Sequence, residues 1–177
     1  MRIIAGSLKG RNYDAPRGHH THPMGDKVKG ALFNTLGDIE GLTVLDAFAG
    51  SGALSFEAIS RGASHATAID VDKEAYETMQ ANCQKLGVKD QVMVLRKNVK
   101  GWTRNNQHKQ FDIVLADPPY DEIDPTVLQK LIQQVVTGGV YVLSWPSSEP
   151  IREFDGLELL TSKKHAGAQL VFYRRLN

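Results

Sequence analysis

The stretch VLDAFAGSGALSFEA, residues 44–58, carries the pattern that decides the fold class. An apolar run ends at Asp46, a glycine-rich segment follows, and a helical pattern begins near Gly52. Gly50 and Gly52 allow the backbone to approach a ligand closely, and the start of the next helix offers unpaired N–H groups. This order of strand, turn and helix is typical of the ligand-binding edge of an open α/β sheet.

Asp46 influences which ligand this turn favours. A carboxylate at the strand end would repel a nucleotide phosphate, whereas the amino-acid end of S-adenosylmethionine carries an ammonium group and a nearby sulfonium. Ser55 stands where the dinucleotide-binding fingerprint has its third glycine, which disfavours a nicotinamide or flavin site. The alternative at this point is a glycine-rich turn with a purely structural role.

Outward from this stretch, short apolar runs alternate with amphipathic helices, as in a parallel sheet covered on both faces. We expect strands at 42–47, 65–70, 91–95, 111–117 and 139–144, helices at 52–60, 73–86 and 125–136, and an antiparallel pair at 157–161 and 169–174. The N-terminal residues predict a short hairpin and then a helix from Asp26 to Gly37. The sequence predicts one α/β domain, in which residues 38–177 follow an extension of residues 1–37.

Composition narrows the class of protein. A chain of 177 residues that is 41% hydrophobic can bury one core. No apolar run approaches about 18 residues and no apolar leader precedes the first elements, so we expect a cytoplasmic protein without a membrane span or signal peptide. The single Cys83 cannot form an intramolecular disulfide. His19, His20 and His22 have no second ligand cluster beside them, so we expect no metal site.

Charge is distributed unevenly along the chain, although the formal net charge is only +1. Residues 1–36, 96–110 and 161–177 carry net charges of +4, +5 and +4, whereas residues 37–95 and 111–160 carry −5 and −7. If the basic segments meet on one face, they form a patch suited to phosphates. The alternative is three unrelated solvated segments, and composition does not decide between them.

Polar residues also follow the second and third predicted strands. Asp70 comes 24 residues after Asp46, near the roughly 20-residue spacing at which an acidic side chain accepts hydrogen bonds from ribose hydroxyls. Asp72 shares that strand end, but it could equally cap the next helix. Asn98 follows the third strand and is our candidate for reading an adenine edge, although asparagine is also common in turns without a ligand.

The motif Asp117-Pro118-Pro119-Tyr120 directly follows the strand FDIVLA. Two prolines remove two backbone N–H donors and stiffen the chain, so its carbonyl groups are presented outward. A planar exocyclic amine could donate to the Asp117 carboxylate and the Pro118 carbonyl while Tyr120 stacks on the base. The alternative is an ordinary strand-ending turn without a functional role. A second strand-end site in the same sheet disfavours this alternative.

The whole chain resembles the RsmD family of small-subunit ribosomal RNA guanine-N2 methyltransferases. The matching stretches are MRIIAGSLKGR (1–11), DKVKGALFNTLG (26–37), VLDAFAGSGALSFEAISRGA (44–63) and FDIVLADPPY (111–120). The central motifs are shared with many amino-methyltransferases, and the N-terminal stretch and the ALFN helix narrow the resemblance to this family. It implies a Rossmann-like class I S-adenosylmethionine-dependent methyltransferase fold, a mostly parallel sheet with an antiparallel edge plus a short N-terminal hairpin and helix.

The resemblance also implies a function and a set of site residues. The expected activity is methylation of a guanine amine in 16S rRNA, within the small ribosomal subunit or an assembly intermediate, by a monomer with S-adenosyl-L-methionine as cofactor. The expected catalytic residues are Asp117, Pro118, Pro119 and Tyr120. The expected cofactor-binding residues are Asp46, Phe48, Ala49, Gly50, Ser51, Gly52, Asp70, Val71, Asn98 and Val99, and the expected RNA-binding residues are Lys9, Arg11, His22 and Met24.

Two other classes of function stay open from the sequence. Adenine and glutamine side-chain amides also present planar NH₂ groups, so a DNA or protein amino-methyltransferase of the same fold is one alternative. Only 57 residues follow Tyr120, which leaves no room for a separate DNA target-recognition domain. The other alternative is an RNA-binding relative with impaired catalysis.

Overall fold

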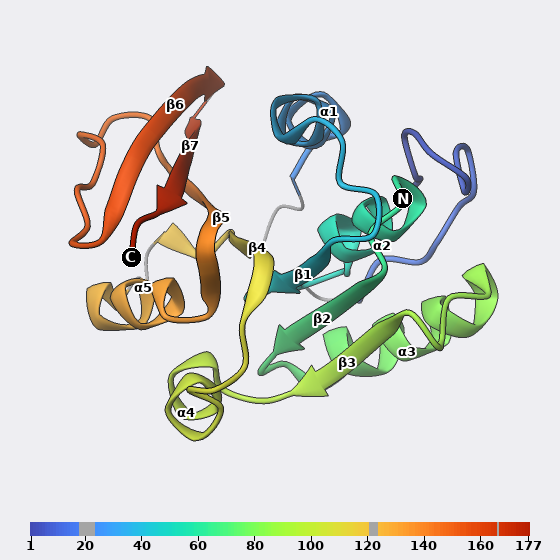
Figure 1. Cartoon of the computed structure of the whole chain (residues 1–177). Helices are drawn as coiled ribbons and strands as arrows, with labels where there is room; N and C mark the ends of the chain where they lie inside the picture. The colour runs from blue at the N-terminus through green and yellow to red at the C-terminus, as the bar shows by residue number, and fades with distance from the viewer. Residues whose placement is uncertain (18–23, 121–123, 166) are drawn as a thin grey trace.

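A computed structural model describes residues 1–17, 24–120, 124–165 and 167–177 (Figure 1). These residues form a seven-stranded sheet in the order β3-β2-β1-β4-β5-β7-β6. The strands are β1 (Thr43–Asp46), β2 (His65–Asp70), β3 (Val92–Arg96), β4 (Phe111–Ala116), β5 (Val135–Pro146), β6 (Leu157–His165) and β7 (Ala168–Arg175). Strands β1 to β5 pair in parallel, whereas β7 pairs antiparallel with both β5 and β6.

Helices cover both faces of the sheet (Figure 1). They are α1 (Asp26–Leu36), α2 (Ala53–Ser60), α3 (Lys73–Leu86), α4 (Val99–Asn105) and α5 (Pro125–Ile132). Successive strand residues point to opposite faces, so Val44 packs in one core cluster with α1, α2 and α3, while Leu45 packs in a second cluster with α4 and α5. Both faces of the central strands are therefore buried, as parallel strands require.

The predicted strands and the antiparallel edge are confirmed, and the helices differ from the prediction in two places. The helix predicted at 125–136 ends at Ile132, because Val135 already pairs with Phe111 as the start of β5. Helix α4 was not predicted, since its seven residues include Gly101 and few apolar side chains. The predicted N-terminal hairpin is present, because the backbone N–H groups of Ile3 and Tyr13 donate to the oxygens of Arg11 and Met1, each at 3.0 Å, on either side of an antiparallel bridge between Arg2 and Asn12.

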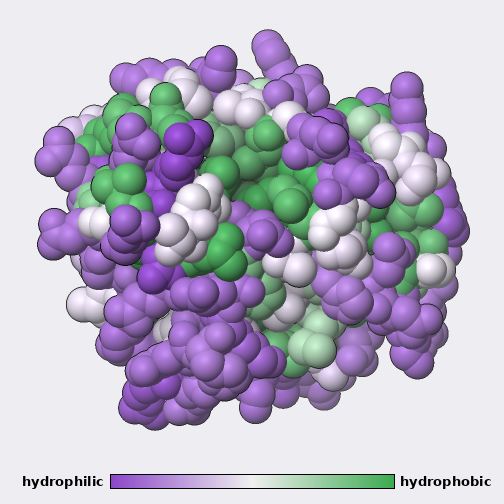
Figure 2. Space-filling view, viewed as in Figure 1, coloured by the Kyte–Doolittle hydropathy of each residue, from purple (hydrophilic) through white to green (hydrophobic). Residues whose placement is uncertain are grey.

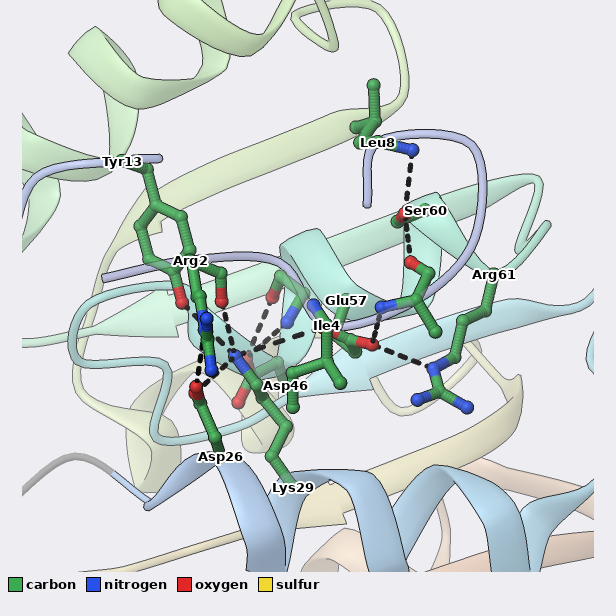
Figure 3. A network of polar contacts seen from close by, with 12 residues as sticks. Arg2, Ile4, Leu8, Tyr13, Asp26, Lys29, Asp46, Glu57, Ser60 and Arg61 are labelled. Atoms are coloured by element: carbon green, nitrogen blue, oxygen red, sulfur yellow. Dashed lines mark hydrogen bonds and ion pairs between the residues drawn. The ribbon is translucent and has the colours of Figure 1, made fainter. Parts of the chain in front are cut away.

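A buried carboxylate holds the N-terminal residues against the sheet domain (Figure 3). The side chain of Glu57, on α2, is fully buried and accepts hydrogen bonds from the backbone N–H groups of Ile4 (2.9 Å) and Ala5 (3.1 Å). It also accepts from Arg61 at 2.8 Å and lies 3.8 Å from the ammonium group of Lys29, on α1. One carboxylate thus connects the N-terminal segment, α1 and α2.

Lys29 is 1% exposed, so its charge depends on nearby partners. Its ammonium group donates to the backbone oxygen of Arg2 at 3.0 Å and lies within 4 Å of Asp26 and Glu57. Burial lowers the pKa of Lys29, and the negative charges of Glu57 and Asp26 oppose that shift. The buried ammonium and the buried carboxylate therefore stabilise each other.

Close backbone contact fixes the N-terminal segment at a second point. Gly6 has a positive φ of 84°, and a Cβ atom there would lie 1.7 Å from the backbone oxygen of Ser60, at the end of α2. That oxygen accepts from the N–H of Ser7 at 2.7 Å, and the Ser60 hydroxyl accepts from the N–H of Leu8 at 2.9 Å. Glycine is needed because any side chain would push the segment off α2.

Among the described residues, no helix combines the length and the apolar character needed to cross a membrane.

Replacing Glu57 with Ala should lower the free energy of unfolding in urea by about 3–5 kcal/mol, because Lys29 and two backbone N–H groups would lose their partner inside the protein. Glu77 supplies the control, since it forms an exposed ion pair with Lys73 on α3. Glu77→Ala should cost at most about 0.5 kcal/mol. Equal losses for the two variants would contradict the role given to Glu57.

Candidate active site

The candidate site lies where the parallel strands β2, β1 and β4 end. Asp46 is the last residue of β1, Asp70 is the last residue of β2, and Asp117 directly follows β4. Because these strands are neighbours and run in parallel, their carboxyl ends share one edge of the sheet. The charges of Asp117 and Asp70 both act on Asp46, in keeping with their proximity.

The glycine-rich loop turns tightly between β1 and α2. Gly50 and Gly52 have φ angles of 52° and 78°, in the left-handed region that favours glycine. A Cβ atom on Gly52 would lie 2.7 Å from the ring of Phe56, whereas one on Gly50 would meet no atom within 4 Å. Gly52 is therefore needed for packing, and Gly50 borders open space.

Asp46 is the most deeply buried of the three carboxyl groups of the site. Its side chain is 1% exposed, and its Oδ2 atom accepts from both the hydroxyl (2.8 Å) and the N–H (3.2 Å) of Ser55. Its Oδ1 atom is buried and has no hydrogen-bond partner among the described residues. Burial raises the pKa of Asp46 to about 7, the hydrogen bonds from Ser55 oppose this, and the charges of Asp117 and Asp70 add to it.

Asp70 binds the glycine-rich loop from the neighbouring strand. Its Oδ2 atom accepts from the N–H of Gly50 at 2.7 Å, and its Oδ1 atom accepts from the N–H of Asp72 at 2.9 Å. Each carboxylate oxygen can accept more than one hydrogen bond, so these contacts leave capacity for a ribose hydroxyl. Val71, the next residue, is 64% exposed at the same strand end.

The other residues predicted to bind the cofactor lie in the glycine-rich loop, at the start of α4 or in the hydrophobic core. Ala49 and Ser51 are nearly buried in the glycine-rich loop, and Phe48 packs against the α4 and α5 side of the core. Asn98 caps α4, because its side-chain oxygen accepts from the N–H of Gly101 at 3.3 Å. Val99 is buried in the same core cluster as Phe48, which places its side chain in the protein interior.

The Asp117 to Tyr120 motif makes a contact that the sequence did not reveal. The hydroxyl of Tyr120 lies 2.8 Å from the hydroxyl of Ser144, near the end of β5. Burial raises the pKa of Asp117, and a hydrogen bond from Ser144 opposes that shift. Ser144 ends the apolar run GGVYVLS, so the strand-end rule that selected the aspartates could also have selected Ser144.

Two of the residues expected to bind RNA have contacts inside the chain. Arg11 donates to the backbone oxygens of Leu86 (2.8 Å) and Lys85 (2.7 Å), so its guanidinium group satisfies the end of α3. Met24 lines a narrow hollow beside Asp117 and Ser144. Lys9 is exposed, and His22 lies outside the described residues.

A metal site and a joint basic patch are the other two features that the sequence raises. Among the described residues, no group of three His, Cys, Asp or Glu side chains is arranged to hold a metal ion. Two of the basic segments begin at opposite ends of the sheet, because Arg96 ends β3 and residues 161–177 contain β7 and part of β6.

A family model described as "Conserved hypothetical protein 95" matches residues 1–174. The chain belongs to this family. The YlbH protein of Bacillus subtilis (strain 168) is 37% identical over 137 residues, which cover 76% of this chain and 74% of that protein. The Haemophilus influenzae protein named "Ribosomal RNA small subunit methyltransferase D" is 37% identical over 123 residues, which cover 68% of this chain and 64% of that protein. The predicted resemblance to the RsmD family is confirmed.

The match extends to the three-dimensional structure. The yhhF protein of Escherichia coli superposes with a TM-score of 0.89 at 26% identity, over 99% of this chain and 98% of that chain. The Escherichia coli (strain K12) protein named "Ribosomal RNA small subunit methyltransferase D" is 35% identical over 121 residues, which cover 68% of this chain and 60% of that protein. The matched residues thus span less than two thirds of the length of these proteins named methyltransferase D. The superposition on the yhhF protein confirms the predicted Rossmann-like methyltransferase fold.

The raised pKa of Asp46 predicts how stability depends on pH. The native carboxyl group binds a proton up to about pH 7, whereas in the unfolded chain it releases that proton near its ordinary value of 3.8. Between about pH 4 and about pH 7 the native state therefore binds more protons than the unfolded chain. Over this range the contribution of Asp46 to the free energy of unfolding falls by at most about 1.4 kcal/mol per pH unit.

Asp46→Asn keeps an oxygen for Ser55 and removes the titration. Urea unfolding from pH 4.5 to 8 should show the stability of the variant rising relative to the original chain up to about pH 7, and constant above that. A pH-independent difference between the two proteins would contradict the assignment.

Proposed function

We propose that this chain transfers a methyl group from S-adenosyl-L-methionine to the exocyclic amine of a guanine in 16S rRNA. The observation that carries the proposal is the set of three aspartates at the ends of three adjacent strands, one of which has a buried oxygen that no described residue contacts by a hydrogen bond. The relatives named as ribosomal RNA small subunit methyltransferases support the substrate class. The substrate is the small subunit or an assembly intermediate, because a small enzyme benefits from a pre-shaped RNA surface.

The residues at the ends of β1 and β2 fit this cofactor. A buried, unpartnered carboxylate oxygen is costly unless a cation or a donor comes to it, and Asp46 has such an oxygen. Asp46 would hold the cationic amino-acid end, Gly50 and Gly52 would allow close approach of the backbone, and Asp70 would accept from the ribose. The cofactor, when bound, supplies a methyl group on a positively charged sulfur.

The residues after β4 would position the amine. The lone pair of a guanine amine is delocalised into the ring, which makes the amine a poor nucleophile. Donation of its two hydrogens to the Asp117 carboxylate and the Pro118 carbonyl would favour a more localised lone pair, and fixed alignment lowers the barrier further. Asp117 or a water then takes the proton that the amine loses, and the raised pKa of this half-buried carboxyl group suits it to accept one.

Tyr120 would support the base from its side. Its ring is 38% exposed, so it offers a surface on which a base can stack. Its hydroxyl is held by the buried Ser144 at 2.8 Å, which limits rotation of the side chain. An aromatic ring stacks on any base, so Tyr120 does not select guanine. We assign selection of the amine to Asp117 and Pro118.

The test is methyl incorporation from tritium-labelled S-adenosyl-L-methionine into small ribosomal subunits that lack the modification. Asp117→Ala should lower turnover about 100-fold or more, because it removes an interaction made with the reacting amine. Asp90→Ala, an exposed aspartate ahead of β3, should leave turnover unchanged. Unchanged turnover in Asp117→Ala would refute the role of this residue.

Parallel reactions with DNA and with protein distinguish the amino-methyltransferases of other substrate classes. The proposal predicts label in the ribosomal particle alone. Label only in DNA or only in protein would replace the substrate. Absence of cofactor binding in calorimetry at millimolar concentration would instead favour an RNA-binding relative without catalysis.

A further inference from the structure

The hairpin of β6 and β7 reaches the edge of the sheet that carries the candidate site. Pro146, at the end of β5, pairs with Ala168, and Ala168 pairs with His165 at the end of β6. The end of β5 shares its edge with the end of β4, because these two strands are parallel. The end of β6 and the start of β7 therefore lie at the same edge of the sheet as the Asp117 motif.

Strand register fixes where Lys163 lies relative to that motif. Ser144 pairs with Leu170 on β7, and Leu170 pairs with Lys163 on β6. Residues directly opposite each other on neighbouring strands point to the same face. Lys163 thus lies on the face of Ser144, two strand spacings or about 10 Å from it along the sheet.

Lys164 occupies the adjacent position but the other face. It pairs with Gln169, which pairs with Trp145, and Trp145 belongs to the core cluster of α4 and α5. Leu170, beside Lys163, belongs instead to the cluster that includes α1. Lys163 and Lys164 therefore carry the same charge at the same end of the hairpin, but they lie on opposite faces of the sheet.

The lysine charges at this end are not neutralised within the described part of the chain. Both side chains are exposed, and neither forms an ion pair with a described residue, whereas Lys85 and Lys100 are paired with Asp14 and Asp124. The strand-end aspartates place acidic and not basic side chains at the centre of the edge, so the centre does not attract a polyanion. A polyanionic substrate therefore needs positive charge at the side of the site.

One face of the molecule combines apolar and hydrophilic surface. Figure 2 shows hydrophobic residues reaching the surface near the middle of the visible face, with hydrophilic residues around them. A nucleobase suits an apolar area, and its phosphates suit a charged margin.

We propose that Lys163 binds a backbone phosphate of the RNA next to the nucleotide whose base enters the Asp117 site. The proposal rests on the proposed function and adds a contact surface to it. The occupant is the sugar–phosphate backbone of RNA, because an uncompensated lysine recognises phosphate by charge and not by sequence. Lys163 acts in substrate binding and takes no part in the chemistry.

The experiment measures binding of unmodified small ribosomal subunits to the full chain over a range of KCl concentrations. Lys163→Ala should raise the dissociation constant about threefold or more and reduce the slope of log K against log [KCl] by about 0.7–0.9, the loss of one phosphate contact. Lys89→Ala, an exposed lysine ahead of β3 at the opposite edge, should change neither quantity. Lys164→Ala should have a smaller effect than Lys163→Ala, because its side chain is on the other face.

Controls separate this proposal from the proposed reaction. Calorimetry with S-adenosyl-L-methionine should give the same affinity for Lys163→Ala and the original chain, and turnover at saturating particle concentration should agree within about twofold. An unchanged dissociation constant and salt slope in Lys163→Ala, while the original chain methylates the particle, would overturn the phosphate contact alone. A Lys163-dependent binding without any methyl transfer would support the surface and refute the reaction.

Discussion

Three carboxyl groups at one edge of a parallel sheet are the constraint from which the rest of the site follows. Parallel pairing of β1 with β2 and β4 brings Asp46, Asp70 and Asp117 to one edge, where burial and the charges of its two neighbours disfavour ionisation of Asp46. Ser55 opposes this with hydrogen bonds to Asp46, and the N–H groups of Gly50 and Asp72 donate to Asp70. One oxygen of Asp46 has no hydrogen-bond partner in the described part of the chain, which suits a site for a cationic ligand.

The two buried carboxyl groups Glu57 and Asp46 differ in how many donors surround them. Glu57 has several donors and a buried ammonium group nearby, so it stabilises the junction between the N-terminal segment and α2. Asp46, at the start of the same glycine-rich loop, accepts hydrogen bonds only from Ser55 among the described residues. Full pairing at Glu57 gives a rigid support, and incomplete pairing at Asp46 preserves the capacity to bind. The proposed methyl transfer depends on both, because alignment of two reactants requires a rigid frame.

Local patterns predicted the sheet and the strand-end aspartates, since strand, glycine turn and helix follow one another within 15 residues at 44–58. Contacts between distant segments were not predictable in the same way. Arg11 was expected to bind RNA, but its guanidinium group reaches the end of α3, a position set only by the folded N-terminal segment. Glu57 reads as an ordinary helix residue until the N-terminal backbone folds over it. Asn98 has the expected place after β3, where its side chain caps α4.

The most direct test of the account is the number of protons released when S-adenosyl-L-methionine binds, measured by calorimetry in buffers with different ionisation enthalpies. Asp46 is mostly protonated at pH 6 and mostly ionised at pH 8, and a cation should draw it into the ionised form. The account predicts proton release at pH 6 that disappears at pH 8 and is absent in Asp46→Asn. Binding with no proton release at pH 6, or release that persists in Asp46→Asn, would contradict it.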